Sequence, residues 1–390
     1  MNSFVYDIPT RVYFGKDQLQ NLGGELKQLG SKVLLTYGGG SVKRSGLFDK
    51  LASYIKEAGL ELVECGGIQA NPQIEDVRRG VELCKQNNID VILAVGGGSI
   101  MDASKAIAAG ACVDFDPWEF FKNQVPMEKA LPIVAVSTAS ASGSEMDSCL
   151  GIRDPETKEK IELIVSQNCI LPKVTFLDPT ITYGVGEYQT KCGAVDIFSH
   201  VLEQYFDMET GYYVIEGMME SVMRTVIKYA PIALKEPDNY EARANLMWAA
   251  PWAVNGFLTQ GSMKYWTCHA LENQLSANYN STHGQGLAIL MSKWLEYCLS
   301  EETVDRYVKF GVNVFGIDPS LKPMEIAKKS LEMLSDFLYG QLGLADSLTA
   351  IGIPEDKIHQ MAQDACAYGP IYGFTALNAE DVEAIYRMCL

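Results

Sequence analysis

The first half of the chain alternates short apolar runs with segments whose apolar residues recur at helical spacing. The short runs predict strands at 11–14, 32–37, 60–65, 90–95 and 133–138, and the segments between them predict helices at about 45–58, 74–88 and 100–110. Strands that alternate with helices in this way indicate βαβ units, and continuous apolar strands indicate a parallel sheet buried on both faces. We therefore expect an α/β domain at the amino-terminal end.

From about residue 185 the pattern changes. Apolar residues recur at helical spacing through 190–235, 240–260, 262–279 and 285–300, and on toward Leu390. Short runs rich in valine and isoleucine become scarce, so strands are not expected there. The pattern predicts two domains, an α/β domain over residues 1–184 and an all-helical domain over residues 185–390.

Glycine-rich turns follow two of the predicted strands, in VLLTYGGGS and VILAVGGGS. Glycines let a backbone approach a phosphate closely, and a helix that starts directly afterwards offers free N–H groups. Neither turn matches the GxGxxG or GxxxxGK[ST] pattern, so nucleotide binding and an ordinary tight turn both remain open. A third loop, STASASGSEMD at 137–147, also follows a strand and carries the hydroxyls of Thr138 and Ser142. Taken alone, this loop sequence is more typical of a solvated serine-rich loop than of a cofactor-binding one.

The helical half contains candidate metal ligands. Asp196 and His200 are four positions apart in AVDIFSHVLEQYF, so a helix would place them on one face. His269 and His283 follow in WTCHALENQLSANYNSTHGQG, with a turn expected near His283. One carboxylate and three imidazoles suit Fe(II), Zn(II), Co(II) or Mn(II). Residue chemistry alone leaves a metal site and ordinary packing evenly matched, and the fourth histidine, His359, is expected to be solvated.

Composition narrows the classes of partner. The 49 acidic and 32 basic residues give a formal charge of −17, which opposes binding to nucleic acid. No apolar run reaches 18 residues, so no membrane span is expected. The start of the chain lacks the pattern of a signal peptide, and the ten cysteines are scattered singly. We therefore expect a cytoplasmic protein with free thiols, and the acidic charge does not exclude a small anionic cofactor.

Several motifs together resemble a known family. GGGSIMDASK, the SGSE loop, FLDPT, DIFSH and THGQG resemble the iron-containing, or metal-dependent group III, alcohol dehydrogenases. NLMWAAPWAVNGF and GFTALNAEDVEAIY are similar to the butanol dehydrogenase branch, which uses NAD(P)H. The resemblance extends over nearly the whole chain. It implies a Rossmann-like α/β dinucleotide-binding domain followed by an all-α metal-binding domain, the architecture of dehydroquinate synthase.

The resemblance also implies roles for individual residues. The metal ligands fall on Asp196, His200, His269 and His283. Positions that line the cofactor are Gly39, Ser41, Asn71, Gly97, Gly98, Ser99, Asp102, Thr138, Ser142, Lys160 and Val185. Relatives strict for NAD carry an aspartate where this chain has Gly39, so the resemblance favours NADP over NAD, with Lys43 nearby. The expected metal is Fe2+, with Zn2+ as the alternative, and the expected assembly is a homodimer.

The implied activity is an NAD(P)-dependent alcohol dehydrogenase, or aldehyde reductase, for short- to medium-chain primary alcohols and aldehydes such as butanol and butanal. Trp252, Phe257 and Trp266 are candidates to line its apolar substrate pocket, although such aromatics are more often plain core.

At one position that bears on catalysis, this sequence differs from the pattern of the family it resembles. Many relatives carry a proton-relay histidine where this chain has Asn273, and asparagine is neither acid nor base near neutral pH. Ser142 also replaces a usual threonine. Asn273 leaves open a metal- and nucleotide-binding homologue with impaired catalysis. The shared architecture separately leaves open a lyase-type synthase that uses NAD transiently.

Overall fold

The computed structural model describes residues 2–157, 159–165, 168–209 and 211–390, and it divides into two compact units. Asp7–Val185 form an α/β unit, and Gly186–Leu390 form a helical unit together with the first residues of the chain. The Asn2 N–H donates to the Gly261 carbonyl at 2.8 Å, and the Tyr6 ring packs edge-on against Phe257. These contacts hold the chain start against the helical unit. The predicted fold class is confirmed.

A six-stranded sheet forms the centre of the α/β unit. Its strands, in spatial order, are β1 (Arg11–Phe14), β8 (Val174–Leu177), β5 (Ile133–Ser137), β4 (Val91–Gly96), β2 (Lys32–Thr36) and β3 (Glu61–Cys65). Every neighbouring pair is parallel. The five predicted strands are present, and β8 is an additional one. Because all carboxyl ends lie at one edge, the turns after β2, β4 and β5 share that edge.

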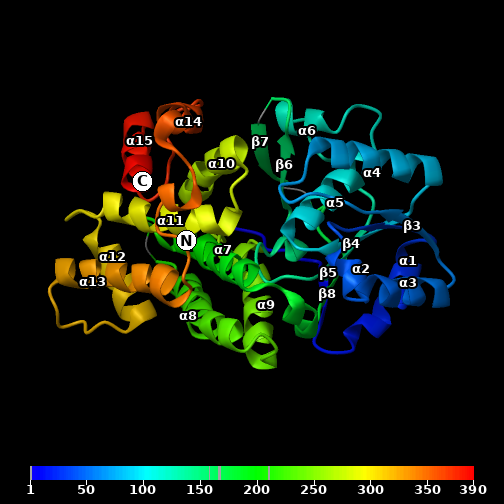
Figure 1. Cartoon of the computed structure of the whole chain (residues 1–390), viewed down its shortest axis with the longest axis horizontal. Coiled ribbons are helices and arrows are strands. Elements are labelled where there is room, and N and C mark those ends of the chain that lie inside the picture. Colours follow the sequence, from blue (N-terminus) through cyan, green and yellow to red (C-terminus); the bar gives the residue numbers. More distant parts are fainter. Residues whose placement is uncertain (1, 158, 166–167, 210) are drawn as a thin grey trace. The chain divides into compact units, whose positions relative to one another are not determined.

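Helices cover both faces of this sheet (Figure 1). Val33 and Leu35 of β2 point to the face that packs against α1 (Leu22–Leu29) and α3 (Leu47–Glu57). Leu34, between them, points to the opposite face, which packs against α4 (Ile74–Asn87) and α5 (Gly98–Gly110). All three side chains are fully buried. Burial on alternating sides explains why the strands are apolar at every position.

The α/β unit also contains elements that the apolar pattern did not predict. β6 (Cys149–Asp154) and β7 (Glu159–Ile164) form a separate antiparallel sheet, and α2 (Ser41–Arg44) and α6 (Trp118–Lys122) are single short helices. The Gly151 N–H of β6 donates to the Asp102 carboxylate of α5 at 3.0 Å. This bond ties the small sheet to the helix that starts at the second glycine-rich turn.

The helical unit contains nine α-helices among its described residues. They are α7 (Glu187–Tyr205), α8 (Tyr213–Lys235), α9 (Tyr240–Val254), α10 (Thr267–Tyr279), α11 (His283–Cys298), α12 (Val304–Phe315), α13 (Pro323–Ser335), α14 (Ile358–Ala365) and α15 (Ala379–Met388). The helical pattern predicted over 190–235 is divided between α7 and α8, and Gly211 between them adopts a positive φ of 92°. Every α7 residue from Cys192 to Tyr205 is buried, so Asp196 and His200 lie inside the unit.

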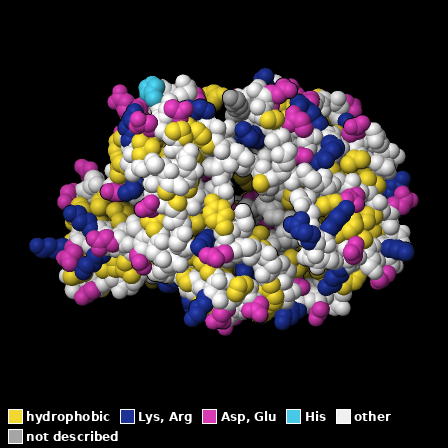
Figure 2. All heavy atoms as spheres, in the orientation of Figure 1, with side chains coloured by type: hydrophobic (Ala, Val, Ile, Leu, Met, Phe, Trp, Pro, Cys, Tyr) yellow, Lys and Arg dark blue, Asp and Glu magenta, His cyan; other side chains and the backbone are white. Residues whose placement is uncertain are grey.

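Charged side chains of both signs are spread over the surface. Figure 2 shows lysine and arginine side chains interspersed with aspartate and glutamate over most of the face in view. Among the described residues, no helix combines the length and the apolar character needed to cross a bilayer.

Candidate metal centre and nucleotide-binding turns

Three helices bring the four predicted ligands together. Asp196 and His200 come from α7, His269 from α10 and His283 from the first position of α11. Ligand atoms of Asp196, His200 and His269 all lie within 4.8 Å of one another, and these three residues are buried. The Asp196 Oδ1 atom lies 3.6 Å from His200 Nε2 and 3.7 Å from His283 Nε2. His283 therefore borders the same centre, although it starts a helix where a turn was expected.

The three imidazole rings crowd this centre. The His200 and His269 rings are stacked with centroids 4.7 Å apart, and the His269 and His283 centroids are 5.1 Å apart. Burial lowers the pKa of His200 well below its usual value, and the neighbouring His269 and His283 lower it further. His200 is therefore neutral near pH 7, the form in which a ring nitrogen binds a metal.

Two buried carboxylates orient the other two histidines. His269 Nδ1 pairs with Glu203 Oε1, and His283 Nδ1 pairs with Glu272 Oε2. The second oxygen of Glu203 accepts the backbone N–H of His269 at 3.2 Å. When a carboxylate holds Nδ1–H, the Nε2 lone pair is left for a metal.

Sequence reasoning missed Glu203 and Glu272. Each lies three residues after a candidate ligand on the same helix, Glu203 after His200 and Glu272 after His269. That three-residue spacing was the sequence signal that could have marked both glutamates as neighbours of the metal ligands. Each carboxylate, however, orients a histidine on another helix: Glu203 of α7 pairs with His269 of α10, and Glu272 of α10 pairs with His283 of α11.

Two glycines let α11 approach the other helices. A Cβ atom at Gly284 would lie 2.2 Å from the Cys192 carbonyl oxygen of α7. A Cβ atom at Gly286 would lie 2.9 Å from Cγ of Glu272 on α10. Both distances are shorter than real Cβ contacts, so α11 packs at backbone contact distance and places His283 beside Asp196.

Of the remaining candidates in the helical unit, Trp266 contacts the histidine rings of the centre. Trp266 lies edge-on to His200 at 5.8 Å and to His269 at 5.4 Å between ring centroids. Trp252 and Phe257 pack against each other, with centroids 6.1 Å apart. Asn273 lies one helical turn after His269, and its buried Oδ1 has no hydrogen-bond partner among the described residues.

The donor set fits a divalent transition metal. Asp196, His200 and His269 form a buried cluster, and the half-buried His283 borders it through Asp196. The rings of His269 and His283 have carboxylate partners. Such N3O sets suit Fe(II) and Zn(II), and no thiolate belongs to the cluster. The adjacent Cys268 is fully buried in the apolar core, as its helical offset from His269 predicts.

In the α/β unit, the second glycine-rich turn and the serine-rich loop lie against each other. Gly97 precedes α5, whose first residues are Gly98 and Ser99. A Cβ atom at Gly98 would lie 2.4 Å from Ser142 Oγ, and the Thr138 N–H donates to the Gly96 carbonyl at 3.0 Å. The amino end of α5 is therefore a bare backbone edge of the kind that binds phosphate.

The first glycine-rich turn has an open side. Gly39 follows β2, Ser41 begins α2, and a Cβ atom at Gly39 would meet no atom within 4 Å. Lys43, which the sequence places near this turn, is already engaged. Its Nζ donates to Glu64 Oε1 at 2.5 Å and lies 4.7 Å from the Phe48 ring centroid.

Three further cofactor candidates lie outside these turns. Asn71 adopts a left-handed conformation with φ 51° just before α4. Lys160 lies on β7, with its Nζ 3.1 Å from Glu162 Oε1. The Val185 N–H donates to the Thr182 carbonyl at 3.0 Å, at the end of the α/β unit.

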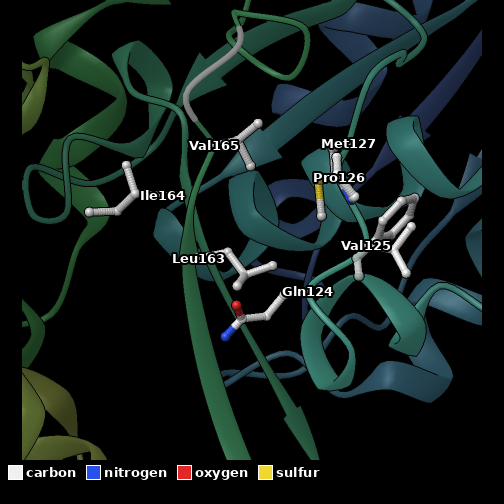
Figure 3. Close-up of a pocket in the computed structure, with 8 residues that line it drawn as sticks. Gln124, Val125, Pro126, Met127, Leu163, Ile164 and Val165 are labelled. Carbon is white, nitrogen blue, oxygen red and sulfur yellow. The ribbon is translucent and has the colours of Figure 1, made fainter.

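A separate pocket of about 220 Å³ lies between residues 124–127 and the end of β7 (Figure 3). Leu163 and Val165 point toward the 124–127 segment, whereas Ile164 points away from it. The lining residues are Phe120, Gln124, Val125, Pro126, Met127, Leu163, Ile164 and Val165. None of these side chains is ionisable or a usual ligand for iron or zinc.

Comparisons with known proteins give matches over nearly the whole chain. Residues 9–179 match the sequence model "iron-containing alcohol dehydrogenase", and residues 190–390 match the carboxyl-terminal domain of the same family. The chain is 44% identical to NADH-dependent butanol dehydrogenase A of Clostridium acetobutylicum, over 99% of both chains. It is 36% identical to the NADPH-dependent aldehyde reductase YqhD of Escherichia coli, over 75% of both. The crystal structure of NADH-dependent butanol dehydrogenase A from Thermotoga maritima superposes with a TM-score of 0.94 at 36% identity, covering 100% of this chain and 99% of that one.

Proposed function

The chain belongs to the iron-containing alcohol dehydrogenase family, and from this membership we propose that it interconverts short- to medium-chain primary alcohols and aldehydes, such as butanol and butanal, with NAD(P)(H). The observation that carries the proposal is the buried cluster of Asp196, His200 and His269, with His283 at its border. Residues 1–184 would bind the nucleotide, and residues 185–390 would bind metal and substrate.

The side chains described above have distinct parts in this chemistry. Asp196, His200, His269 and His283 would hold the metal, an iron(II) ion, with zinc(II) as the alternative. The metal supplies Lewis acidity toward a carbonyl oxygen, and the nicotinamide supplies hydride. Glu203 and Glu272 hold Nδ1 of His269 and His283, which would leave Nε2 of each ring for the metal. Trp266 covers an edge of the His200 and His269 rings, and this apolar surface suits an alkyl chain better than a charged substrate.

Cofactor choice depends on the first glycine-rich turn. The open space at Gly39 supports the use of NADPH, because no carboxylate at that position repels a 2′-phosphate. Glu64, bound to Lys43, places a carboxylate in the same part of the unit. The relative from Clostridium acetobutylicum is named NADH-dependent and the one from Escherichia coli NADPH-dependent. We propose that both cofactors are accepted, and a preference for NADP stays a prediction.

The proposal is tested by reconstituting metal-free protein with Fe(II), and separately with Zn(II), and following NADPH and NADH oxidation with butanal. Turnover that depends on the metal is the expected result. Binding of metal and cofactor without turnover of any short aldehyde would favour the alternative, a homologue with impaired catalysis.

Replacing Asn273 with histidine should raise kcat for butanal reduction by about a hundredfold at pH 6–7, the lower end of the range for general acid catalysis. Histidine can donate a proton near neutral pH, whereas the asparagine amide cannot. The pH profile of kcat should gain a decline above about pH 6.5, where that imidazole loses its proton. An unchanged profile in a variant with full metal content would show that protons reach the substrate by another route. Asn273→Gln is the matched control.

We also propose, from the family resemblance alone, that the protein acts as a homodimer in the cytoplasm.

A further inference from the structure

A buried lysine lies in α5, just behind the candidate phosphate-binding edge. Lys105 is fully buried, and its Nζ donates to Ser144 Oγ at 2.8 Å, to Asp147 Oδ1 at 2.5 Å and to the Cys149 carbonyl at 2.7 Å. An ammonium group has three N–H donors. All three are used within the protein, so Lys105 has none left for a bound phosphate.

The same contacts continue to the start of α5. The Ser144 hydroxyl accepts from Lys105 and donates to Asp102 Oδ1 at 2.7 Å, while Asp102 Oδ2 accepts the Gly151 N–H at 3.0 Å. We call Asp102, Lys105, Ser144 and Asp147 the Lys105 network. It joins α5 to the loop that follows β5 and to strand β6.

This network adjoins the bare backbone edge. Asp102 lies one helical turn after Gly98, and Ser142, whose hydroxyl lies against Gly98, is two residues before Ser144. The Ser144 N–H also donates to Ser142 Oγ at 3.3 Å. The network therefore fixes the separation between the amino end of α5 and the serine-rich loop.

The network also balances charge behind that edge. Asp102, Glu145 and Asp147 supply three carboxyl groups in this region, and Lys105 is the cation among them. Burial raises the pKa of Asp102 to about 6, and the Lys105 ammonium opposes that shift. Carboxylates near a helix amino terminus compete with a bound anion, so their neutralisation favours phosphate binding.

We infer that Lys105 is a positioning residue for the pyrophosphate of the cofactor: it holds the serine-rich loop against α5 and neutralises the carboxylates behind the phosphate-binding edge, without touching the cofactor. This inference rests on the proposed use of NAD(P). A pyrophosphate would meet the N–H groups at Gly98 and Ser99, whose placement depends on Lys105.

The test uses the full-length, metal-loaded protein and measures the binding of ADP and of adenosine by calorimetry, without substrate. Lys105→Met keeps the length of the side chain and removes its charge. We expect it to weaken ADP binding by about tenfold, in the range of helix-terminus effects on anions, and to leave adenosine binding and metal content unchanged. The KM for NADH and NADPH should rise with little change in kcat. Ser144→Ala removes one of the three acceptors of Lys105 and the link to Asp102 but keeps the ion pair with Asp147, so it should have a smaller effect of the same sign.

Lys85→Met is the matched control, because the Lys85 ammonium donates to the Val113 carbonyl at the exposed surface of the same unit. Lys85→Met should change neither the affinity for ADP nor the affinity for adenosine. Unchanged ADP binding in folded Lys105→Met, or an equal loss of ADP and adenosine binding, would overturn the inference. If Lys105→Met does not fold, Ser144→Ala decides by the same criteria. Wild-type protein that binds ADP but reduces no aldehyde would overturn the proposed function and leave this inference standing.

Discussion

Replacing His269 with alanine should remove the bound metal and lower kcat/KM for aldehyde reduction by at least about a thousandfold. His269 contributes one of three ring nitrogens to a buried set, and its loss leaves Asp196 and His200 without their partner on α10. Lewis-acid assistance is worth several kcal/mol, and each 1.36 kcal/mol corresponds to about a tenfold change in rate. Metal content by elemental analysis and butanal turnover should fall together, and His283→Ala should behave in the same way.

His359 supplies the control, because it is the remaining histidine of the chain. Its side chain is 71% exposed, and its Nδ1 lies 2.7 Å from Glu383 Oε2 on the surface of the same unit. His359→Ala should keep full metal content and turnover. Full metal content in His269→Ala would rule out the proposed ligand set.

Replacing Glu272 with glutamine should weaken metal affinity by about 10- to 100-fold, the usual effect of losing an outer partner of a ligating histidine. The Oε1 atom of Glu272 accepts the hydroxyls of Ser276 at 2.7 Å and Ser281 at 3.0 Å, while Oε2 pairs with His283 Nδ1. Glutamine keeps the shape of this side chain but removes the charge that holds Nδ1–H. The metal dissociation constant, measured by competition with a chelator, should rise while the fold is retained.

Glu383→Gln is the matched control for this substitution. It removes the same charge from a glutamate–histidine pair, but the histidine is the exposed His359. Its metal affinity should equal that of the unchanged protein. An equal affinity for Glu272→Gln would show that the carboxylate does not orient His283 as a ligand. Glu203→Gln tests the corresponding pair at His269.

The sequence predicts the central strands because burial on both faces makes each of them a continuous apolar run. β6 and β7 escaped prediction because charged residues interrupt them, as in Cys149–Asp154 and Glu159–Ile164. The single helical pattern over 190–235 concealed the break between α7 and α8, because apolar residues continue on both sides of it.

The candidate site also contains a part that local sequence spacing predicts and a part that depends on how the helices pack. Asp196 and His200 could be paired from sequence, because one helix sets their spacing. The pairing of Glu203 with His269 and of Glu272 with His283 depends on how α7, α10 and α11 pack, which no local pattern encodes. The burial of Lys105 could not be predicted either, because a lysine in a helical pattern is usually exposed. Its burial results from Ser144, Asp147 and Cys149, which are about 40 residues further along the chain.

The contact at Gly284 has a consequence for ion selection. The backbones of α11 and α7 are in direct contact there, as a methyl group at Gly284 would lie 2.2 Å from the Cys192 carbonyl oxygen. Side chains can rotate to accommodate ions of different radius, but two helices in backbone contact cannot move closer together. If Asp196 and His283 both hold the ion, the helix spacing sets a lower limit on the distance between them, and the backbone as well as the donor atoms would limit the size of ion that fits.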